Sequence, residues 1–214
     1  MYRSLFTFII EYGLAVFLFL KAPESRYKKY LFWIIFFLAS YQLGEFITFT
    51  GHLFLGIRVS YFSTTLLPAL GVLLLEKISN RNYGGKYLFF LAISLALAYF
   101  MRPYLIEDIY LSEYCIFVEK SDSLVVQVWD YYYSLAVTFS MGLIVYHYLR
   151  ATSEPLKKLY LYLFSGYSSF WVVGWIFIFL FGNDRGGVTS IICAFALIGA
   201  FIFSYIPWIK IDTD

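Results

Sequence analysis

Residues 55–77 read LGIRVSYFSTTLLPALGVLLLEK, an apolar run that has Arg58 near its start and ends with Glu76 and Lys77. Several hydroxyl side chains precede Pro68 in the middle of the run. A membrane-spanning helix needs about 20 mostly apolar residues. Ser and Thr side chains can offer local partners for the carbonyl that a mid-helix proline leaves unpaired. The stretch therefore predicts a spanning helix that lies inside a bundle.

The composition of the whole chain also indicates a membrane protein. Of the 214 residues, 61% are hydrophobic and 14% are charged, whereas soluble domains have roughly 45–50% apolar and about 25% charged residues. The chain has room for about seven spans with short connections. We therefore predict an all-α membrane protein with one seven-helix domain over residues 1–214. The expected spans are 4–20, 31–50, 58–77, 87–100, 131–148, 159–181 and 190–208.

Most basic residues fall on one predicted side of the bundle, after the first, third, fifth and seventh helices. Because cytoplasmic loops carry an excess of Lys and Arg, we predict that the N-terminus lies outside and the C-terminus lies in the cytoplasm. This pattern explains the net charge of +2 without a nucleic-acid partner, and the short loops suit a prokaryotic plasma membrane. Eleven of the 16 basic residues contribute: Lys21, Arg26, Lys28, Lys29, Lys77, Arg81, Lys86, Arg150, Lys157, Lys158 and Lys210.

The longest connection, residues 107–129, lies on the outer side between the fourth and fifth predicted helices. It carries five acidic residues against one Lys, and its short apolar runs are rich in β-branched and aromatic residues. Such runs favour strands, and connections of this length usually carry structure or function. We expect a small β-hairpin or a lid over the outer mouth of the bundle.

Two acidic residues lie at similar depth in the outer halves of the first two helices. Glu11 is about 10 Å from the outer end of its helix at 1.5 Å per residue, and Glu45 lies near the outer end of the next helix. Carboxylates at this depth are costly, so they should face the interior, carry a proton or pair with a cation. The candidate cations are Arg58 and Arg102.

These residues predict an outward-facing pocket with polar groups and aromatic walls, the usual form of a small-molecule site. An alternative is a structural ion pair of Glu45 with Arg58 or Arg102, with Glu11 near lipid headgroups. The candidate ligand-binding residues are Glu11, Tyr41, Gln42, Glu45, Arg58, Tyr61, Arg102, Asp130, Trp171 and Trp175.

The sequence argues against enzymatic function. It has no nucleophile elbow, phosphate loop or His-Glu-x-x-His motif. His52 and His147 lie at opposite ends of predicted helices, and the two Cys residues form no metal motif. We therefore expect no catalytic residues, no cofactor and no bound metal.

The motif LGIRVSYF at residues 55–62, followed by LLPAL at residues 66–70, resembles the N-terminal seven-transmembrane sensor domain of bacterial and archaeal histidine kinases and diguanylate cyclases. The resemblance implies an input module that senses an extracellular, lipidic or membrane-borne cue and passes a helix shift to a cytoplasmic output. Few residues follow the last predicted helix. The chain is thus expected to work through a signalling partner, or to be the membrane part of a longer protein.

Three functions fit these observations. The first is a receptor-like sensor in which a small or lipidic ligand favours one of two helix arrangements. The second is a small-solute transporter. The third is an accessory or structural subunit of a membrane complex. Membrane lipids are expected partners in each case.

Overall fold

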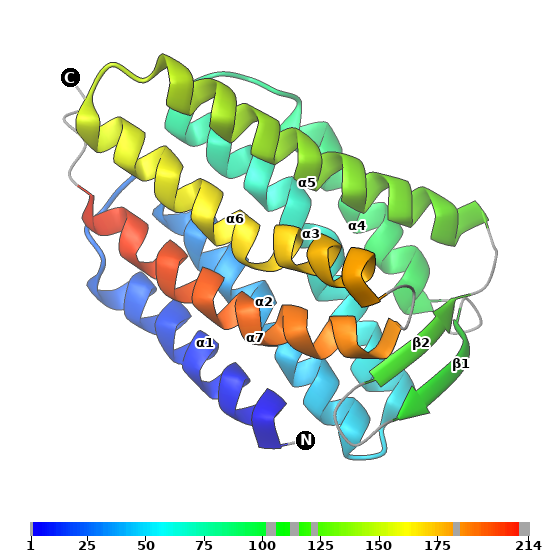
Figure 1. Cartoon of the computed structure of the whole chain (residues 1–214). Coiled ribbons are helices and arrows are strands. Elements are labelled where there is room, and N and C mark those ends of the chain that lie inside the picture. The colour runs from blue at the N-terminus through cyan, green and yellow to red at the C-terminus, as the bar shows by residue number, and fades with distance from the viewer. Residues whose placement is uncertain (1, 102–105, 112–115, 121–123, 182–184, 210–214) are drawn as a thin grey trace.

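The computed structural model describes residues 2–101, 106–111, 116–120, 124–181 and 185–209, and Figure 1 shows their arrangement. The described residues form seven α-helices, as predicted, and two strands. The helices are α1 (Tyr2–Lys21), α2 (Lys28–Phe49), α3 (Leu53–Ser79), α4 (Gly85–Met101), α5 (Leu124–Arg150), α6 (Glu154–Phe181) and α7 (Arg185–Tyr205), followed by a 3₁₀ turn (Ile206–Trp208). The strands are β1 (Ile106–Leu111) and β2 (Ile116–Lys120).

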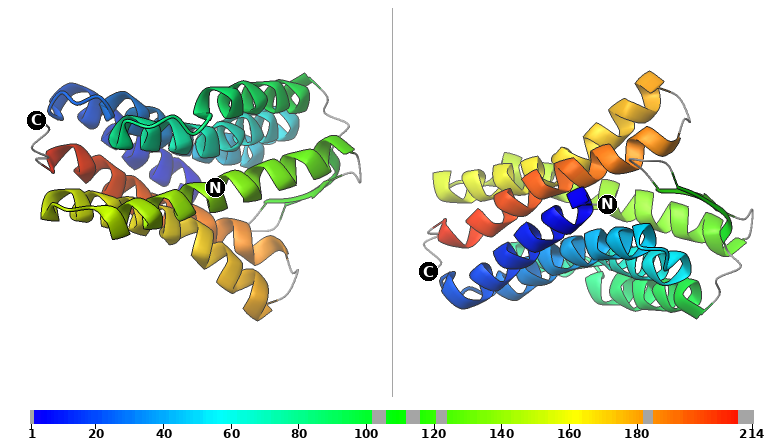
Figure 2. Two further views of the ribbon diagram at one scale, coloured as in Figure 1. Left: turned by 90° about the horizontal axis from the view of Figure 1, so that it is seen from above. Right: turned by 90° about the horizontal axis from the view of Figure 1, so that it is seen from below.

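The helices form one closed bundle. Each of α2, α3 and α4 packs on the helix before it, α5 packs on α3, α6 on α5, and α7 on α6. The bundle closes because α7 also packs on α1 and α2. The strands pair antiparallel, with Ile109 opposite Val118. They lie at the end of the bundle where α5 begins, and there α6 and α7 tilt away from the other helices (Figure 2).

Within the described residues, three helices, α1, α2 and α3, are long and apolar enough to cross a membrane. In the most apolar 18-residue stretch of each helix, 61% of the residues are buried in α3 but only 28% in α1. Many of the other α1 side chains, including Phe6, Phe17 and Phe19, are exposed apolar groups on the outside of the bundle. The helix that contains Pro68, α3, is therefore the most buried of these three, as its sequence predicts.

The Ser and Thr side chains of α3 do not have the predicted role beside Pro68. The helix continues through Pro68, which frees the carbonyl of Thr64 four residues earlier. The hydroxyls of Thr64 and Thr65 instead donate to carbonyls of the preceding turn. Support near the proline comes from α5, where the hydroxyl of Tyr132 donates to the carbonyl of Thr65 at 2.8 Å.

Small residues bring α2 and α3 close together. Gly44 and Thr48 lie four residues apart on α2, and Gly56 and Ser60 have the same spacing on α3. The Ser60 hydroxyl also donates to the backbone carbonyl of Tyr41 at 3.2 Å. Small residues at this spacing allow helix backbones to approach closely, as in membrane helix pairs. This contact fixes the position of the C-terminal part of α2, which carries Glu45.

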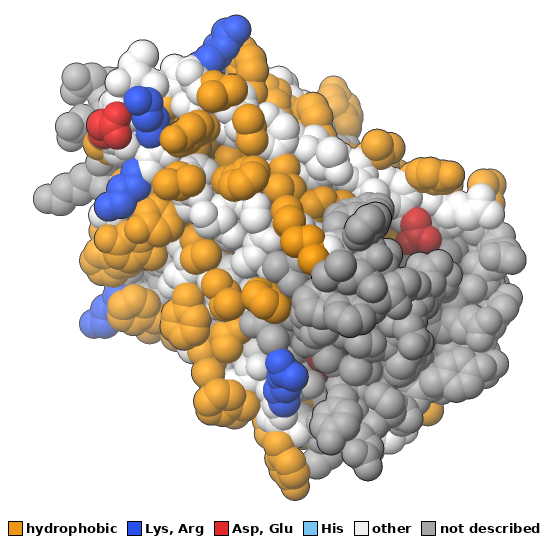
Figure 3. Space-filling model, viewed as in Figure 1, with side chains coloured by type: hydrophobic (Ala, Val, Ile, Leu, Met, Phe, Trp, Pro, Cys, Tyr) orange, Lys and Arg blue, Asp and Glu red, His pale blue; other side chains and the backbone are white. Residues whose placement is uncertain are grey.

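Charged and apolar side chains are separated along the bundle. On the face drawn in Figure 3, Lys and Arg side chains gather mainly at the end where α6 begins, and apolar side chains cover much of the surface between the ends. The basic connections between α1 and α2, α3 and α4, and α5 and α6 all lie at this end. This end therefore corresponds to the predicted inner side.

Candidate functional site

The first turns of α1 place a polar stripe against α2. Ser4, Thr7 and Glu11 are all buried, and spacings of three and four residues put them on one helix face. The same face continues with Ala15 and Leu18. The buried face of α1 is therefore polar in its first half and apolar in its second.

The side of α2 that faces this stripe carries Gln42 and Glu45, both buried. The Ser4 hydroxyl donates to one oxygen of the Glu45 carboxylate at 3.3 Å. The Tyr41 hydroxyl, one helical turn earlier on α2, donates to the other oxygen at 3.1 Å. Hydroxyl groups from two helices thus hold the Glu45 carboxylate in place.

Glu11 has a different environment. Its side chain is 0% exposed, and neither carboxylate oxygen has a hydrogen-bond partner in the described part of the chain. It also interacts electrostatically with Glu45. A buried carboxyl group without partners carries a large desolvation cost. Glu11 therefore provides unused acceptor oxygens next to a second, well-held carboxylate.

The predicted cations do not complete this site within the described residues. The Arg58 guanidinium lies 5.8 Å from the centre of the Phe100 ring of α4, and its Nε is buried without a hydrogen-bond partner. Among the ion pairs between described residues, none joins Arg58 to Glu45. The alternative of a structural ion pair between Arg58 and Glu45 is therefore not supported. The other candidate cation, Arg102, lies outside the described residues.

Two of the predicted aromatic residues, Tyr61 and Trp171, belong to a second group on α3, α5 and α6. The ring of Tyr61 lies 5.4 Å from Trp129, Trp129 lies 5.2 Å from Tyr133, and Tyr133 lies 5.8 Å from Trp171. The indole of Trp129 donates to the Thr65 hydroxyl at 2.7 Å. These contacts describe a packed row of rings across three helices.

Of the other predicted residues, Asp130 is exposed on α5. The side chain of Trp175 lies outside the described ones, although its backbone belongs to α6. The predicted pocket thus separates into an acidic group between α1 and α2 and an aromatic group between α3, α5 and α6. Ser60 links them, because it bonds the backbone of Tyr41 and directly precedes Tyr61.

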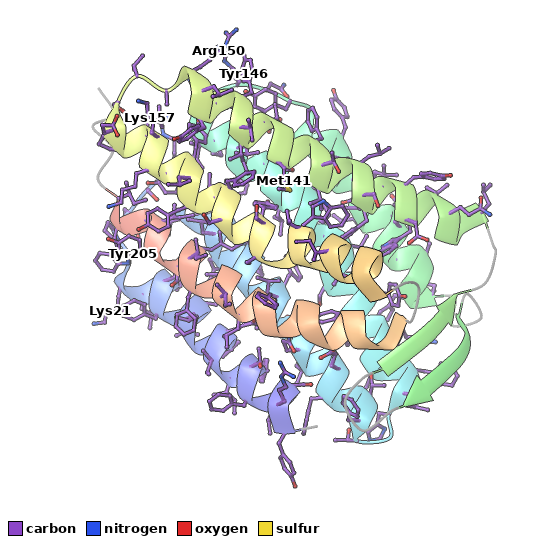
Figure 4. The ribbon with its side chains drawn as sticks, in the orientation of Figure 1. Lys21, Met141, Tyr146, Arg150, Lys157 and Tyr205 are labelled. Carbon is purple, nitrogen blue, oxygen red and sulfur yellow. The ribbon has the colours of Figure 1, made fainter. Side chains whose placement is uncertain are left out.

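A hollow of about 520 Å³ lies between α5 and α6, but it is not the predicted polar pocket. Its lining is mostly apolar and includes Met141, Val172 and Trp171, so it contains one predicted site residue and neither acid. Figure 4 shows Met141 on the middle of α5. The acidic group is therefore the better candidate for specific recognition.

Sequence reasoning missed Ser4 and Thr7. They lie seven and four residues before Glu11, so the helical period already places them on its face. It also missed the bond between Thr65 and Trp129, which are 64 positions apart in sequence. A contact of that kind has no local sequence signal.

The chain was also compared with known proteins. No protein-family model matches it, and no curated protein matches it either. The functional interpretation therefore depends on the geometry of the acidic group and on the membrane-like character of the helices.

Proposed function

We propose that the protein is a receptor-like membrane sensor that binds a small or lipidic ligand at the acidic group formed by Ser4, Thr7, Glu11, Tyr41, Gln42 and Glu45. In this proposal all seven helices span a prokaryotic plasma membrane, with the N-terminus outside. The segregation of basic residues to one end supports this orientation. The strand pair β1–β2 at the other end would act as a lid.

The observation that carries the proposal is the unpaired carboxyl group of Glu11. A membrane helix rarely keeps an ionisable side chain in its buried face unless that side chain functions in binding or transport. Glu45 already accepts bonds from Ser4 and Tyr41, whereas Glu11 accepts none in the described part. A ligand with a positive charge or a hydrogen-bond donor would satisfy Glu11.

The acidic group also provides a route for the signal. The ligand would contact α1 and α2, and α2 packs closely on the central helix α3 through Gly44 and Gly56. A ligand that binds one arrangement of α1 and α2 more tightly would shift the population of α3 positions. The inner end of α3 would then transmit the change to a cytoplasmic signalling partner.

A thermal-shift titration with ethanolamine, choline and alkylamines tests the proposal. Ligand binding to the folded state raises the unfolding temperature in a concentration-dependent manner. We expect at least one of these cations to raise it in the unmodified protein but not in Glu11→Gln. The matched control is Glu24→Gln, because Glu24 is 91% exposed at the opposite end. Equal shifts in all three proteins would contradict a site at Glu11.

A small-solute transporter is the second candidate, and the same carboxyl group favours it. Unpaired acidic residues in membrane helices also occur on proton and ion pathways. Uptake into proteoliposomes that depends on a proton gradient and is lost in Glu11→Gln would favour transport. Ligand binding without uptake would favour the sensor.

A further inference from the structure

A second hollow lies at the opposite end of the bundle from the acidic group. It has a volume of about 570 Å³ and is formed by the last turn of α5, the first two turns of α6, and the end of α7 with the following turn. Its lining includes Tyr148, Lys157, Lys158, Leu161, Tyr205 and Trp208. Figure 4 shows Lys157 of α6 and Tyr205 of α7 at the same end of the bundle.

We propose that this hollow binds an anionic phospholipid of the adjacent membrane leaflet through the lipid phosphate. The proposal needs the membrane insertion described above, but it is independent of the ligand site at Glu11. It assigns a lipid-binding role to residues that the sensor function does not use.

The polar part of the hollow fits a phosphate group. The Lys157 side chain is 39% exposed and its Nζ donates to Glu154 at 3.0 Å. An ammonium group has three donors, so two remain for a ligand. Glu154 is 86% exposed, and such a surface pair is weak. Lys158 adds a second charge, with its Nζ 5.9 Å from the centre of the Tyr162 ring.

The N-terminus of α6 adds to the attraction of the hollow for an anion. Both Lys residues lie in the first turns of α6, where the helix dipole is positive. Glu154 neutralises one of the two cationic side chains at most. The hollow therefore favours an anion.

The apolar part of the hollow distinguishes a lipid from free phosphate. Leu161 and Trp208 are 52% and 43% exposed, and Tyr205 is 48% exposed. Trp and Tyr are typical of the membrane interface, where their rings lie at the level of the lipid headgroups. Basic pockets between helices on the cytoplasmic side recognise anionic headgroups. Cations directly beside exposed apolar side chains thus match an amphipathic anion.

Native mass spectrometry of the full chain in mild detergent tests the proposal, with phosphatidylglycerol as the probe and phosphatidylcholine as the neutral lipid. We expect a saturable phosphatidylglycerol adduct, and about tenfold weaker binding in the Lys157→Gln/Lys158→Gln double variant. The Lys77→Gln/Lys86→Gln variant removes the same charge at the same end, outside the hollow, and should bind like the unmodified protein. Lys157→Arg/Lys158→Arg should also retain binding.

Three results would overturn the proposal. The first is equal binding of the two lipids. The second is an equal loss of binding in the double variant and in its Lys77/Lys86 control. The third is displacement of phosphatidylglycerol by inorganic phosphate at millimolar concentration, which would assign the hollow to free phosphate. Membrane insertion is tested separately by cysteine labelling, and loss of the amine response would leave the lipid result unaffected.

Discussion

Gly44 of α2 and Gly56 of α3 face each other without room for a side chain on either. A Cβ atom added to Gly44 would lie 2.6 Å from the backbone oxygen of Gly56, and one added to Gly56 would lie 2.4 Å from the oxygen of Gly44. Both distances involve backbone atoms, so neither clash can be relieved by a side-chain rotation. The two glycines therefore set the distance between the helix that carries Glu45 and the central helix of the bundle.

Gly44→Ala should destabilise the protein by about 1–3 kcal/mol, because overpacking forces backbone shifts. The measurement is the thermal unfolding midpoint in detergent. Gly13→Ala is the matched control, since a Cβ there meets nothing within 4 Å. Alanine is a better helix former than glycine by about 1 kcal/mol, so the control should be neutral or stabilising. An unchanged midpoint in Gly44→Ala would show that α2 and α3 are further apart than described.

Glu11→Gln should raise the unfolding midpoint of the ligand-free protein. The substitution keeps the size of the side chain but removes a buried carboxyl group that has no hydrogen-bond partner in the described residues. Binding sites often keep such destabilising groups, so their removal trades function for stability. Glu24→Gln should leave the midpoint almost unchanged. A lower midpoint in Glu11→Gln would indicate that its carboxyl group is already paired.

The bond between Trp129 and Thr65 should contribute to the packing of α5 on α3. Thr65→Val leaves the buried indole N–H without its acceptor, which should cost about 1–3 kcal/mol. Thr64→Val is the control, because its hydroxyl donates only to carbonyls of its own helix among the described bonds.

A double-mutant cycle that combines Thr65→Val with Trp129→Phe isolates the free energy of the interaction between the two side chains. We expect a coupling free energy of about 1 kcal/mol between the two side chains. Additive effects of the two substitutions would exclude a stabilising bond.

The proposed orientation predicts the accessibility of cysteine probes. In a Cys115→Ser/Cys193→Ser background, a membrane-impermeant thiol reagent should label His52→Cys from outside intact cells. Glu24→Cys should react only after the membrane is opened. Both positions are exposed, so neither should disturb packing. Labelling of both positions, or of Glu24→Cys alone, in intact cells would contradict an external N-terminus.

The sequence predicted the helices well because each is an apolar run bounded by polar connections. The observed helices extend beyond several predicted spans. For example, α5 begins at Leu124 rather than near Tyr131, since the apolar residues before Trp129 continue the helix. Glu11 and Glu45, which were predicted at similar depth, lie close enough to interact electrostatically, and their nearness was predictable because position along a helix follows from residue number.

The direction of a side chain around its helix was harder to predict. Arg58 was expected near Glu45, but its guanidinium lies over Phe100 on α4. In a helix such as α3, apolar residues occur on nearly every side, so the sequence pattern does not specify which neighbour each side faces. The separation of the aromatic residues from the acids has the same cause, because it depends on which helices pack together.

The central claim is that Glu11 and Glu45 hold a ligand, and native mass spectrometry of the protein purified in mild detergent tests it most directly. We predict a discrete adduct on the unmodified chain that is lost in both Glu11→Gln and Glu45→Gln and retained in Lys157→Gln/Lys158→Gln. Its mass would identify the class of ligand. Absence of any such adduct from the unmodified chain, or its retention in both Glu variants, would contradict the claim.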